Sequence, residues 1–335
     1  MGLKILHSGL LTTIQDTGRI GYQKEGILVS GAMDTFAIRV GNILVGNPEN
    51  AAAIETTFLG PKIRFEEAGL IAITGADLSP TINGEQVKMW RPLLVSAGCT
   101  LEFGTPRSGS WSYIAVSGSF KIPQVLGSYA TYLRADFGGF KGKPLHVGDI
   151  IPVHGPSEIG AKLSQKLKLS LGTKAWCGVN WTPDPALLPV ISPDPTIKVL
   201  KGPEYEWFAR PSAEKFWQEK FIVTSDSDRM GYQLRGPELS VTDKTEIISS
   251  AVSFGTIQVP PDGHPIVLLA DHQTTGGYPR IGQVCSAHFS SFVQVPMGKK
   301  ITFQEATLPE AQSLYYQQER NILHIKRALH LKIIS

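Results

Sequence analysis

The densest group of side chains suited to chemistry follows an apolar stretch late in the chain. Directly after residues 265–270, the sequence reads Asp271-His272-Gln273-Thr274-Thr275-Gly276-Gly277-Tyr278-Pro279-Arg280. A carboxylate, an amide and two hydroxyls on a glycine turn are typical of a ligand pocket, because glycine lets a substrate approach the backbone. We predict that Asp271, Gln273 and Thr274 are catalytic and that Thr275 and Tyr278 bind substrate. The alternative is a turn whose Asp and Thr side chains only bind local backbone groups.

A second polar pattern, D-x-x-R-x-G-Y-Q-x-x-G, occurs twice, at residues 16–26 and 226–236. An arginine in such a glycine-punctuated loop can hold a carboxylate or phosphate through two hydrogen bonds. We therefore predict a substrate-binding role for the polar side chains that both copies share. These are Arg19, Tyr22 and Gln23 in the first copy and Arg229, Tyr232 and Gln233 in the second. The alternative is that they serve, like the glycines, to form the same turn in each copy.

Other patterns give weaker indications of chemistry. Residues 138–143 are glycine-rich and basic, but they lack the spacing of a phosphate-binding P-loop. His272 and His288 have no acidic residues at metal-ligand spacing, so we predict no metal site in this chain. The three cysteines form no CxxC pair, and we interpret them as buried, unreactive thiols.

The composition is that of an ordinary globular protein. The 335 residues are 42% hydrophobic and 18% charged, with a net charge of +3 and no block of Lys or Arg. This distribution gives no electrostatic indication of nucleic-acid binding. The N-terminal residues lack the features of a signal peptide, and no apolar run is long enough to span a bilayer. We therefore expect a cytoplasmic protein without a membrane partner.

The length and the repeats indicate two domains. A chain of 335 residues exceeds the size at which one core usually stops growing. Besides the repeated motif, residues 3–6 resemble 197–200 and residues 95–103 resemble 295–303, in the same order along the chain. Such a pattern indicates two copies of one domain. We predict a first domain at 1–155, a Pro-rich connection at 156–195, and a second domain at 196–335 that ends in a helix.

Local signals place several elements. Asp34 is a suitable N-cap for a helix with an apolar stripe, and Asn47-Pro48 predicts the start of another short helix. Asn83-Gly84 predicts a β-hairpin, and Thr307-Leu308-Pro309-Glu310 is a capping box that begins the C-terminal helix. Many short strands with few helices predict a mainly β fold made of closed or nearly closed barrels.

Longer stretches of the sequence resemble a known family. The N-terminal stretches are Asp16-Thr17-Gly18-Arg19, Ser30-Gly31-Ala32-Met33-Asp34 and Asn42-Ile43-Leu44-Val45-Gly46-Asn47. The C-terminal stretches are Gly255-Thr256-Ile257-Gln258-Val259-Pro260 and Asp271-x-Gln273-Thr274-Thr275-Gly276-Gly277-Tyr278-Pro279. Together they resemble the biotin-dependent carboxyltransferase-like family, which includes the C subunit of 5-oxoprolinase (the Kip antagonist) and the second subunit of allophanate hydrolase. Residues 127–131 depart from the family pattern G-S-R-S-T, with Tyr and Ala at its third and fourth positions, so no role is carried over there.

The resemblance implies two duplicated cyclophilin-like β-barrel domains. It implies a member of an ATP-hydrolysing 5-oxoprolinase complex, a cytoplasmic hetero-oligomer that opens 5-oxo-L-proline to L-glutamate. ATP, accompanied by Mg, is then a co-substrate of the complex. The implied partners are the A subunit of this enzyme and its B subunit, the Kip inhibitor.

Two alternatives stay open at this point. One is a purely regulatory protein that binds the Kip inhibitor and so acts in sporulation regulation. The other is a carboxyltransferase component that acts on a urea-like amide with carboxybiotin. We do not expect biotin on this chain, because it lacks a lysine-containing attachment sequence.

Overall fold

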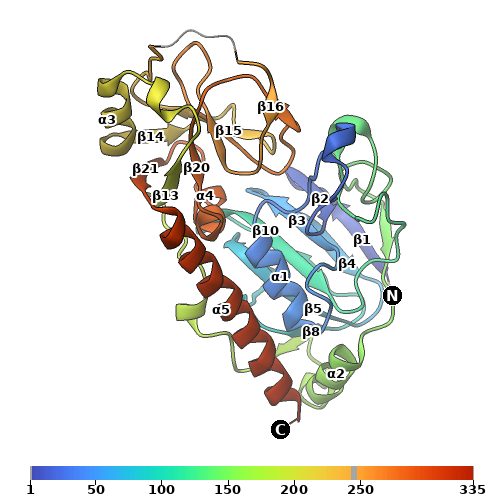
Figure 1. Ribbon diagram of the computed structural model, residues 1–335. Coiled ribbons are helices and arrows are strands. Elements are labelled where there is room, and N and C mark those ends of the chain that lie inside the picture. Colours follow the sequence, from blue (N-terminus) through green and yellow to red (C-terminus); the bar gives the residue numbers. More distant parts are fainter. Residues whose placement is uncertain (1, 243–246, 335) are drawn as a thin grey trace. The chain divides into compact units, whose positions relative to one another are not determined.

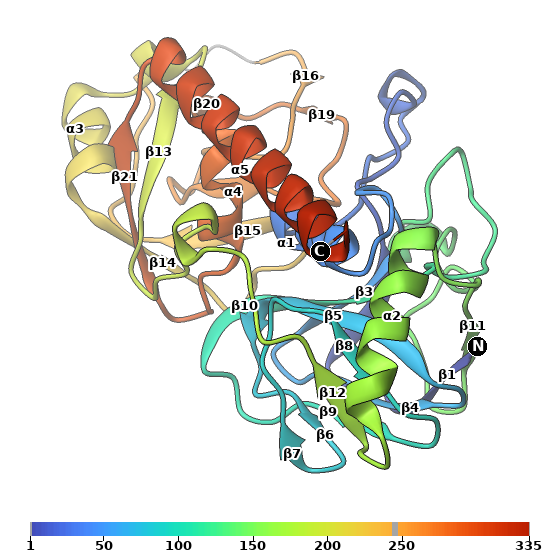
Figure 2. The same cartoon turned by 90° about the horizontal axis from the view of Figure 1, so that it is seen from below.

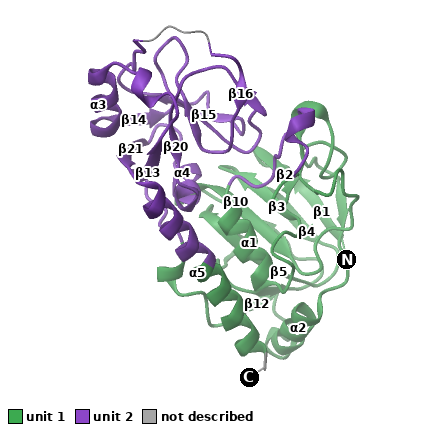
Figure 3. Ribbon diagram, in the orientation of Figure 1, with its two compact units in different colours: residues 1–19, 34–188, 320–335 green, residues 20–33, 189–319 purple. Residues whose placement is uncertain are grey.

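The computed structural model describes residues 2–242 and 247–334 (Figure 1). The chain forms two compact units, which are coloured separately in Figure 3. Unit 1 comprises residues 1–19, 34–188 and 320–335, and unit 2 comprises residues 20–33 and 189–319. These ranges differ from the predicted domain boundaries. Residues 20–33 belong to unit 2, and the second half of the C-terminal helix belongs to unit 1.

Unit 1 contains two six-stranded sheets. The first sheet has the order β11-β1-β4-β9-β6-β7, and the second has the order β12-β8-β5-β10-β3-β2. The strands of the first sheet are β11 (Ile150–Pro152), β1 (Gly2–His7), β4 (Lys62–Phe65), β9 (Thr100–Glu102), β6 (Thr81–Ile82) and β7 (Glu85–Gln86). Those of the second are β12 (Trp176–Gly178), β8 (Leu93–Val95), β5 (Gly69–Asp77), β10 (Ser108–Val116), β3 (Ala53–Thr57) and β2 (Leu11–Gln15).

The sequence of each strand reflects how many of its faces are covered. β1 alternates between buried and half-buried residues, whereas β3 and nearly all of β5 and β10 are buried. Side chains of both sheets form one core that includes Leu3, Phe65, Ile71 and Ile114. The second sheet also packs against helix α1 (Thr35–Leu44) and against α2 (Glu158–Leu171), which runs beside β8 and β12 in Figure 2. It is therefore covered on both faces, which explains its nearly continuous apolar strands.

Unit 2 is built around a closed seven-stranded barrel with the order β13-β20-β17-β18-β15-β14-β21. Its strands are β13 (Thr196–Lys201), β20 (Arg280–Val284), β17 (Thr256–Gln258), β18 (Ile266–Leu268), β15 (Gly231–Arg235), β14 (Lys220–Val223) and β21 (Lys300–Glu305). A separate two-stranded sheet joins β16 (Ser250–Ala251) to β19 (Thr275–Gly276). Helix α3 (Arg210–Gln218) packs on the barrel through Phe216, whose ring stacks 4.7 Å from that of Phe303.

The remaining helices complete the element list. They are α4 (Phe289–Val293), α5 (Leu308–Ile334) and the short 3-10 segments η1 (Gln23–Glu25), η2 (Leu133–Ala135), η3 (Pro185–Leu187), η4 (Tyr205–Trp207) and η5 (Ser286–His288). In the parts of the chain that the structure describes, no helix combines the length and the apolar character needed to cross a membrane. The 27 residues of α5 include several charged side chains.

Most of the local predictions are confirmed. The fold is mainly β with few helices, and unit 2 contains the closed barrel that the strand pattern indicated. The Asp34 side chain caps α1 by accepting a hydrogen bond of 3.0 Å from the Ala37 amide. Asn83 and Gly84 form the turn between β6 and β7, each with the positive φ angle that a tight hairpin turn requires. The Glu310 amide donates to the Thr307 hydroxyl at 3.4 Å, as the capping box predicts.

Two regions differ from the sequence predictions. No helix begins at Asn47, because its side chain binds the Val116 carbonyl and the Gly118 amide, each at 2.8 Å, and so joins this loop to the end of β10. Residues 156–195, predicted as a connection, contain α2 and β12. Ser157 caps α2, whose Leu163 and Leu167 are buried one turn apart. Tertiary packing of these two leucines stabilises a helix whose remaining residues are mostly polar.

Candidate functional site

The polar turn predicted to carry the chemistry lies in unit 2 between β18 and β20 and includes β19. Its start is held to the second copy of the repeated motif, because the Asp271 amide donates to the Arg229 carbonyl at 2.8 Å. β19 pairs with β16 and so holds the middle of the turn. The structure thus brings Asp271 and Arg229, two of the predicted site residues, into direct contact.

Arg229 and Asp271 form a buried ion pair with two hydrogen bonds. Arg229 Nε lies 2.8 Å from Asp271 Oδ2, and Nη2 lies 3.2 Å from Oδ1, with the two side chains only 5% and 7% exposed. Nη2 also donates to the Gly31 carbonyl at 2.6 Å. Both carboxylate oxygens of Asp271 therefore accept hydrogen bonds from one guanidinium group. This geometry favours a role for the pair in positioning the turn.

The far end of the turn is anchored by a second ion pair, between Glu204 and Arg280. Arg280 Nε donates to Glu204 Oε2 at 2.7 Å and Nη2 donates to Oε1 at 2.6 Å. Burial alone would raise the pKa of the Glu204 carboxyl, but its hydrogen bonds to Arg280 and the nearby positive charge hold the pKa below the ordinary value. Sequence reasoning missed Glu204, because nothing in its local context connects it to a residue so distant in the chain.

His272 lies buried beside Asp271 at the base of the turn. Its Nδ1 lies 2.6 Å from the Gln273 carbonyl. Burial lowers the pKa of the His272 imidazole, although the Gln273 carbonyl and the Asp271 charge act in the opposite direction. His272 is therefore mainly neutral near pH 7, with Nδ1 as a hydrogen-bond donor to the carbonyl.

The side chains of the turn that reach the surface are Gln273, Thr275 and Tyr278, while Thr274 is half-buried. Tyr278 is 44% exposed. The two ion pairs hold the ends of the turn and leave these polar side chains accessible from solution. Of the predicted site residues on the turn, Gln273, Thr275 and Tyr278 are the ones placed to contact a small molecule.

The two copies of the repeated motif fold differently after their arginine. In the second copy, residues 231–235 form β15, where the buried Tyr232 hydroxyl donates to the Val293 carbonyl at 2.7 Å and Gln233 is exposed. In the first copy, only Gln23–Glu25 of the equivalent residues form η1, which follows the half-buried Tyr22, and Gln23 is exposed. The two copies therefore do not form the same turn at these positions: Gly21 has a positive φ angle, whereas Gly231 lies in a strand.

Arg19 has a structural position in unit 1 that parallels that of Arg229 in unit 2. It is fully buried and donates from Nε to the Val125 carbonyl at 3.0 Å and from Nη2 to the Ala130 carbonyl at 2.9 Å. Its guanidinium carbon lies 4.7 Å from the centre of the Phe137 ring. These contacts connect the motif to the loop at residues 125–130.

A pocket of about 310 Å³ in unit 1 borders the first copy of the motif. Asp16 shapes one wall, because its carboxylate accepts hydrogen bonds from the Gly18 amide, the Ser128 hydroxyl and the Tyr129 amide at 2.6–2.8 Å. Tyr129, Gln124 and His154 also line it. Sequence reasoning did not select these residues, since they come from separate loops that only the tertiary structure brings together.

The glycine-rich run at 138–143 is folded as a local turn. The Gly142 amide donates to the Gly138 carbonyl at 2.8 Å, and Lys141 lies 3.6 Å from Asp149 and over the ring of Phe140. This arrangement does not form a cradle for phosphate. Within the described residues, no group of three or more His, Cys, Asp or Glu side chains is arranged to hold a metal ion.

The fold and sequence together define the class of protein. The family described as "Carboxyltransferase domain, subdomain A and B" matches residues 25–305, and the chain belongs to this family. It is 37% identical over 328 residues to the C subunit of 5-oxoprolinase from Escherichia coli strain K12, and the match covers 98% of this chain and 99% of that protein. It is 31% identical to urea amidolyase of Lachancea kluyveri, over 95% of this chain but 18% of that protein.

A solved structure shows the same relationship. The Kluyveromyces lactis urea carboxylase matches 97% of this chain with a TM-score of 0.85 and 27% sequence identity, although the match covers 29% of that chain. The resemblance expected from the motifs is therefore confirmed at the level of the family. The chain is similar over nearly its full length to proteins named as the C subunit of 5-oxoprolinase, and similar to one segment of the much longer urea-metabolising enzymes.

Proposed function

We propose that this chain is the C subunit of a 5-oxoprolinase that opens 5-oxo-L-proline to L-glutamate with hydrolysis of ATP. The observation that carries the proposal is the 37% identity to the C subunit of the Escherichia coli 5-oxoprolinase, with nearly complete coverage of both proteins. The relatives with urea-related names contain a match to this chain only as a small part of a larger protein.

The chemistry requires activation of a stable amide. An unstrained lactam hydrolyses slowly, and transfer of the terminal phosphoryl group of ATP to its carbonyl oxygen, with release of ADP, would make the carbonyl carbon more electrophilic. Water would then add to this carbon, the ring C–N bond would break with the nitrogen leaving as the protonated amine, and hydrolysis of the resulting acyl phosphate would release phosphate and L-glutamate. ATP with its Mg is the co-substrate of the complex in this proposal. The A and B subunits of the enzyme are the partners, and the latter is the protein known as the Kip inhibitor.

In this proposal, the turn at 271–280 faces the substrate. Gln273, Thr274, Thr275 and Tyr278 would contact 5-oxo-L-proline, whose carboxylate, amide N–H and carbonyl all form hydrogen bonds. Asp271, fixed by Arg229, would position the turn. Tyr22, Gln23 and Gln233 remain proposed contributors to substrate binding, and the exposed Gln23 and Gln233 are the most accessible among them. The buried Arg19 and Tyr232, whose side chains donate to backbone carbonyls, would instead support the fold of their own segments.

The test is reconstitution with the A and B subunits, followed by measurement of 5-oxoproline- and ATP-dependent release of glutamate. Gln273→Ala should reduce turnover by about tenfold or more while the complex still co-purifies, since removing a hydrogen bond to a charged or reacting group costs about 1.5–3 kcal/mol. Gln218→Ala, which alters another exposed glutamine of unit 2, is the matched control. Normal turnover by Gln273→Ala would remove this turn from the site, and failure to form any complex would refute the proposed membership of this enzyme.

A second candidate is a carboxyltransferase component that moves a carboxyl group from carboxybiotin to a urea-like amide. It is favoured by the name of the family and by the match to urea amidolyase. Biotin would then arrive on another protein. Inhibition of the reconstituted reaction by avidin would support this candidate, and full activity in the presence of avidin would exclude it.

A further inference from the structure

The connection from β18 to β20 has to cross β17. In the barrel order, β17 lies between these two strands and pairs antiparallel with both, so β18 and β20 run parallel to each other. Parallel neighbours of one strand need a connection that crosses over that strand. Here the connection contains the polar turn at 271–280, and β17 belongs to the motif at 255–260. The barrel topology therefore brings this motif and the turn together.

β17 has one apolar face and one polar face. Ile257 is fully buried and belongs to the core of the barrel. Thr256 and Gln258 share the opposite face, because side chains alternate along a strand. These two polar side chains are nevertheless only 4% and 2% exposed. A polar outer face that is buried to this extent must be covered by another segment of the chain.

Gln258 lies directly beneath the middle of the turn. Its Nε2 is 3.5 Å from the Tyr278 carbonyl oxygen, which is a long hydrogen bond. A Cβ built on Gly276 would overlap Nε2 and lie 3.1 Å from Oε1, so the Gln258 amide occupies the space that a side chain at 276 would need. Gly276 has no positive φ angle, so its backbone conformation does not require glycine. Glycine at this position therefore makes room for Gln258 rather than for a substrate.

Thr256 holds an earlier part of the turn through a neighbouring segment. Its Oγ1 accepts a hydrogen bond of 3.1 Å from the Ser253 amide and donates to Gln283 Oε1 at 2.9 Å. The adjacent Val252 amide donates to the Thr274 carbonyl at 3.2 Å. The polar face of β17 thus supports the turn at two points that lie between the ion pairs at its ends.

We propose that Gln258 and Thr256 are positioning residues for the substrate site on the turn. The inference rests on the proposed function, in which exposed side chains of the turn contact 5-oxo-L-proline. The ion pairs fix the ends of the turn, and β17 fixes its middle, from which these side chains project. A binding loop held on a rigid strand loses less conformational freedom when its ligand binds. Gln258 and Thr256 act through the backbone of the turn and do not touch the substrate.

The test is a comparison of KM values in the complex reconstituted with the A and B subunits. Gly276→Ala places a methyl group against the flexible end of the Gln258 side chain, which can move aside, so the variant should fold. Gln258→Met keeps a side chain of similar length but removes the amide. Each substitution should raise KM for 5-oxo-L-proline by about tenfold and leave KM for ATP unchanged, because a small displacement of binding groups has effects of this size.

A double variant tests the contact itself. Gln258→Ala removes the amide and leaves room for a methyl group at position 276. Gly276→Ala should therefore raise KM for 5-oxo-L-proline in the wild type and have no further effect in the Gln258→Ala background. Additive effects of the two substitutions would show that Gly276 does not act through Gln258, and would overturn the proposal.

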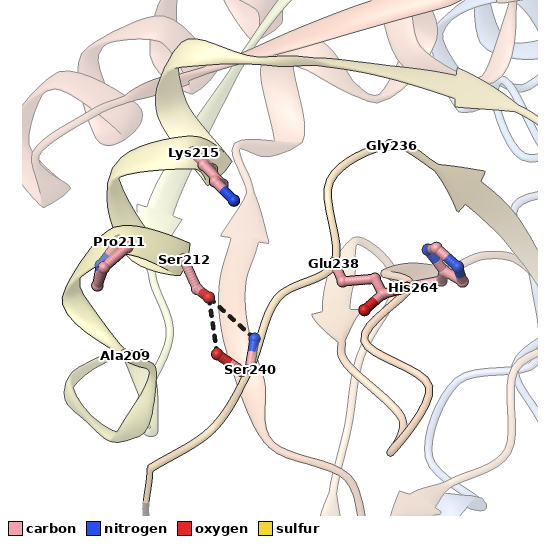
Figure 4. Close-up of a pocket in the computed structure, with 8 residues that line it drawn as sticks. All are labelled: Ala209, Pro211, Ser212, Lys215, Gly236, Glu238, Ser240 and His264. Atoms are coloured by element: carbon pink, nitrogen blue, oxygen red, sulfur yellow. Dashed lines mark hydrogen bonds between the residues drawn. The ribbon is translucent and has the colours of Figure 1, made fainter.

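A matched control lies beside a pocket of about 560 Å³ between α3 and the segment that follows β15 (Figure 4). This pocket shares no residue with β17 or the turn. There, Ser212 Oγ accepts a hydrogen bond of 2.9 Å from the Ser240 amide, as Thr256 Oγ1 does from the Ser253 amide. Ser212→Ala and Thr256→Val should lower the free energy of unfolding to a similar extent. Only Thr256→Val should raise KM for 5-oxo-L-proline.

Hydrogen exchange of the amides of residues 273–277 tests the proposal without enzyme activity. In the isolated protein, Gln258→Met should speed this exchange by about tenfold, and Ser212→Ala should leave it unchanged. Unchanged exchange in Gln258→Met, or an unchanged KM for 5-oxo-L-proline in an active complex, would overturn the proposal. A wild-type complex that releases no glutamate would refute the proposed function instead, and the exchange measurement would then decide whether β17 holds the turn.

Discussion

Arg229 and Asp271 are joined by two hydrogen bonds between their side chains, of 2.8 and 3.2 Å, and by a third between the Asp271 amide and the Arg229 carbonyl. The pair couples the repeated motif to the polar turn, the two features that the sequence singled out for chemistry. Because the guanidinium also binds the Gly31 carbonyl, one side chain fixes three segments of unit 2. Arg229 and Asp271, both predicted site residues, therefore hold segments of unit 2 together directly.

Removal of the Arg229 side chain should strongly destabilise the protein. Arg229→Met leaves the Asp271 carboxylate buried without its partner, which typically costs about 3–5 kcal/mol in the free energy of unfolding. Urea denaturation measures this change. Arg210→Met is the matched control, since it removes an arginine from an exposed pair and should change the value by about 0.5 kcal/mol or less. Equal effects of the two substitutions would show that the Arg229 pair is not structurally important.

Arg19 should behave as a structural residue of unit 1. Arg19→Met removes the donors to the Val125 and Ala130 carbonyls and the contact with Phe137, at an expected cost of about 3 kcal/mol. The loop at 125–130, of which Gly127 is exposed, should also become more sensitive to proteolysis. Arg64→Met, at a half-exposed position of β4, is the control. A normal unfolding curve for Arg19→Met, together with impaired substrate binding, would instead favour the site assignment.

Substitution of the exposed residues of the turn should lower turnover without lowering the stability of the protein. Thr275→Ala and Tyr278→Ala should change the free energy of unfolding by about 0.5 kcal/mol or less, because the turn is held by its two ion pairs and its backbone. Turnover by the reconstituted complex should fall in the same variants. Circular dichroism melts and glutamate release measured on one preparation make the comparison. A large loss of stability would mean that these side chains hold the turn themselves.

His272 should make stability dependent on pH. Burial lowers the pKa of the folded state from the ordinary value of 6.5, so the unfolded chain binds more protons between the two values. The contribution of His272 is therefore fully present above about pH 6.5 and decreases as the pH falls toward the folded-state pKa. In His272→Gln, the fall in stability over this range should be smaller than in the wild type. His146→Gln, at an exposed histidine of unit 1, should retain the wild-type slope. If the stability of His272→Gln depended on pH as steeply as that of the wild type, the prediction would be wrong.

Several features of the protein follow from the sequence alone. The helix cap at Asp34, the hairpin at Asn83-Gly84 and the capping box at Thr307 depend on interactions between residues a few positions apart. For the same reason, the alternation of apolar residues was sufficient to predict a mainly β fold. The family was also recognisable from continuous stretches of sequence, and so was the polar turn that follows an apolar strand.

Only the tertiary structure decided which polar groups meet. The pairing of Glu204 with Arg280 and of Arg229 with Asp271 joins residues far apart in the chain, and no local period encodes such contacts. Asn47 binds the end of β10 where its sequence favoured a helix start, because a distant carbonyl and amide compete for its side chain. Local patterns determine elements over one or two turns, whereas the position of a side chain relative to a remote partner depends on the path of the whole backbone between them.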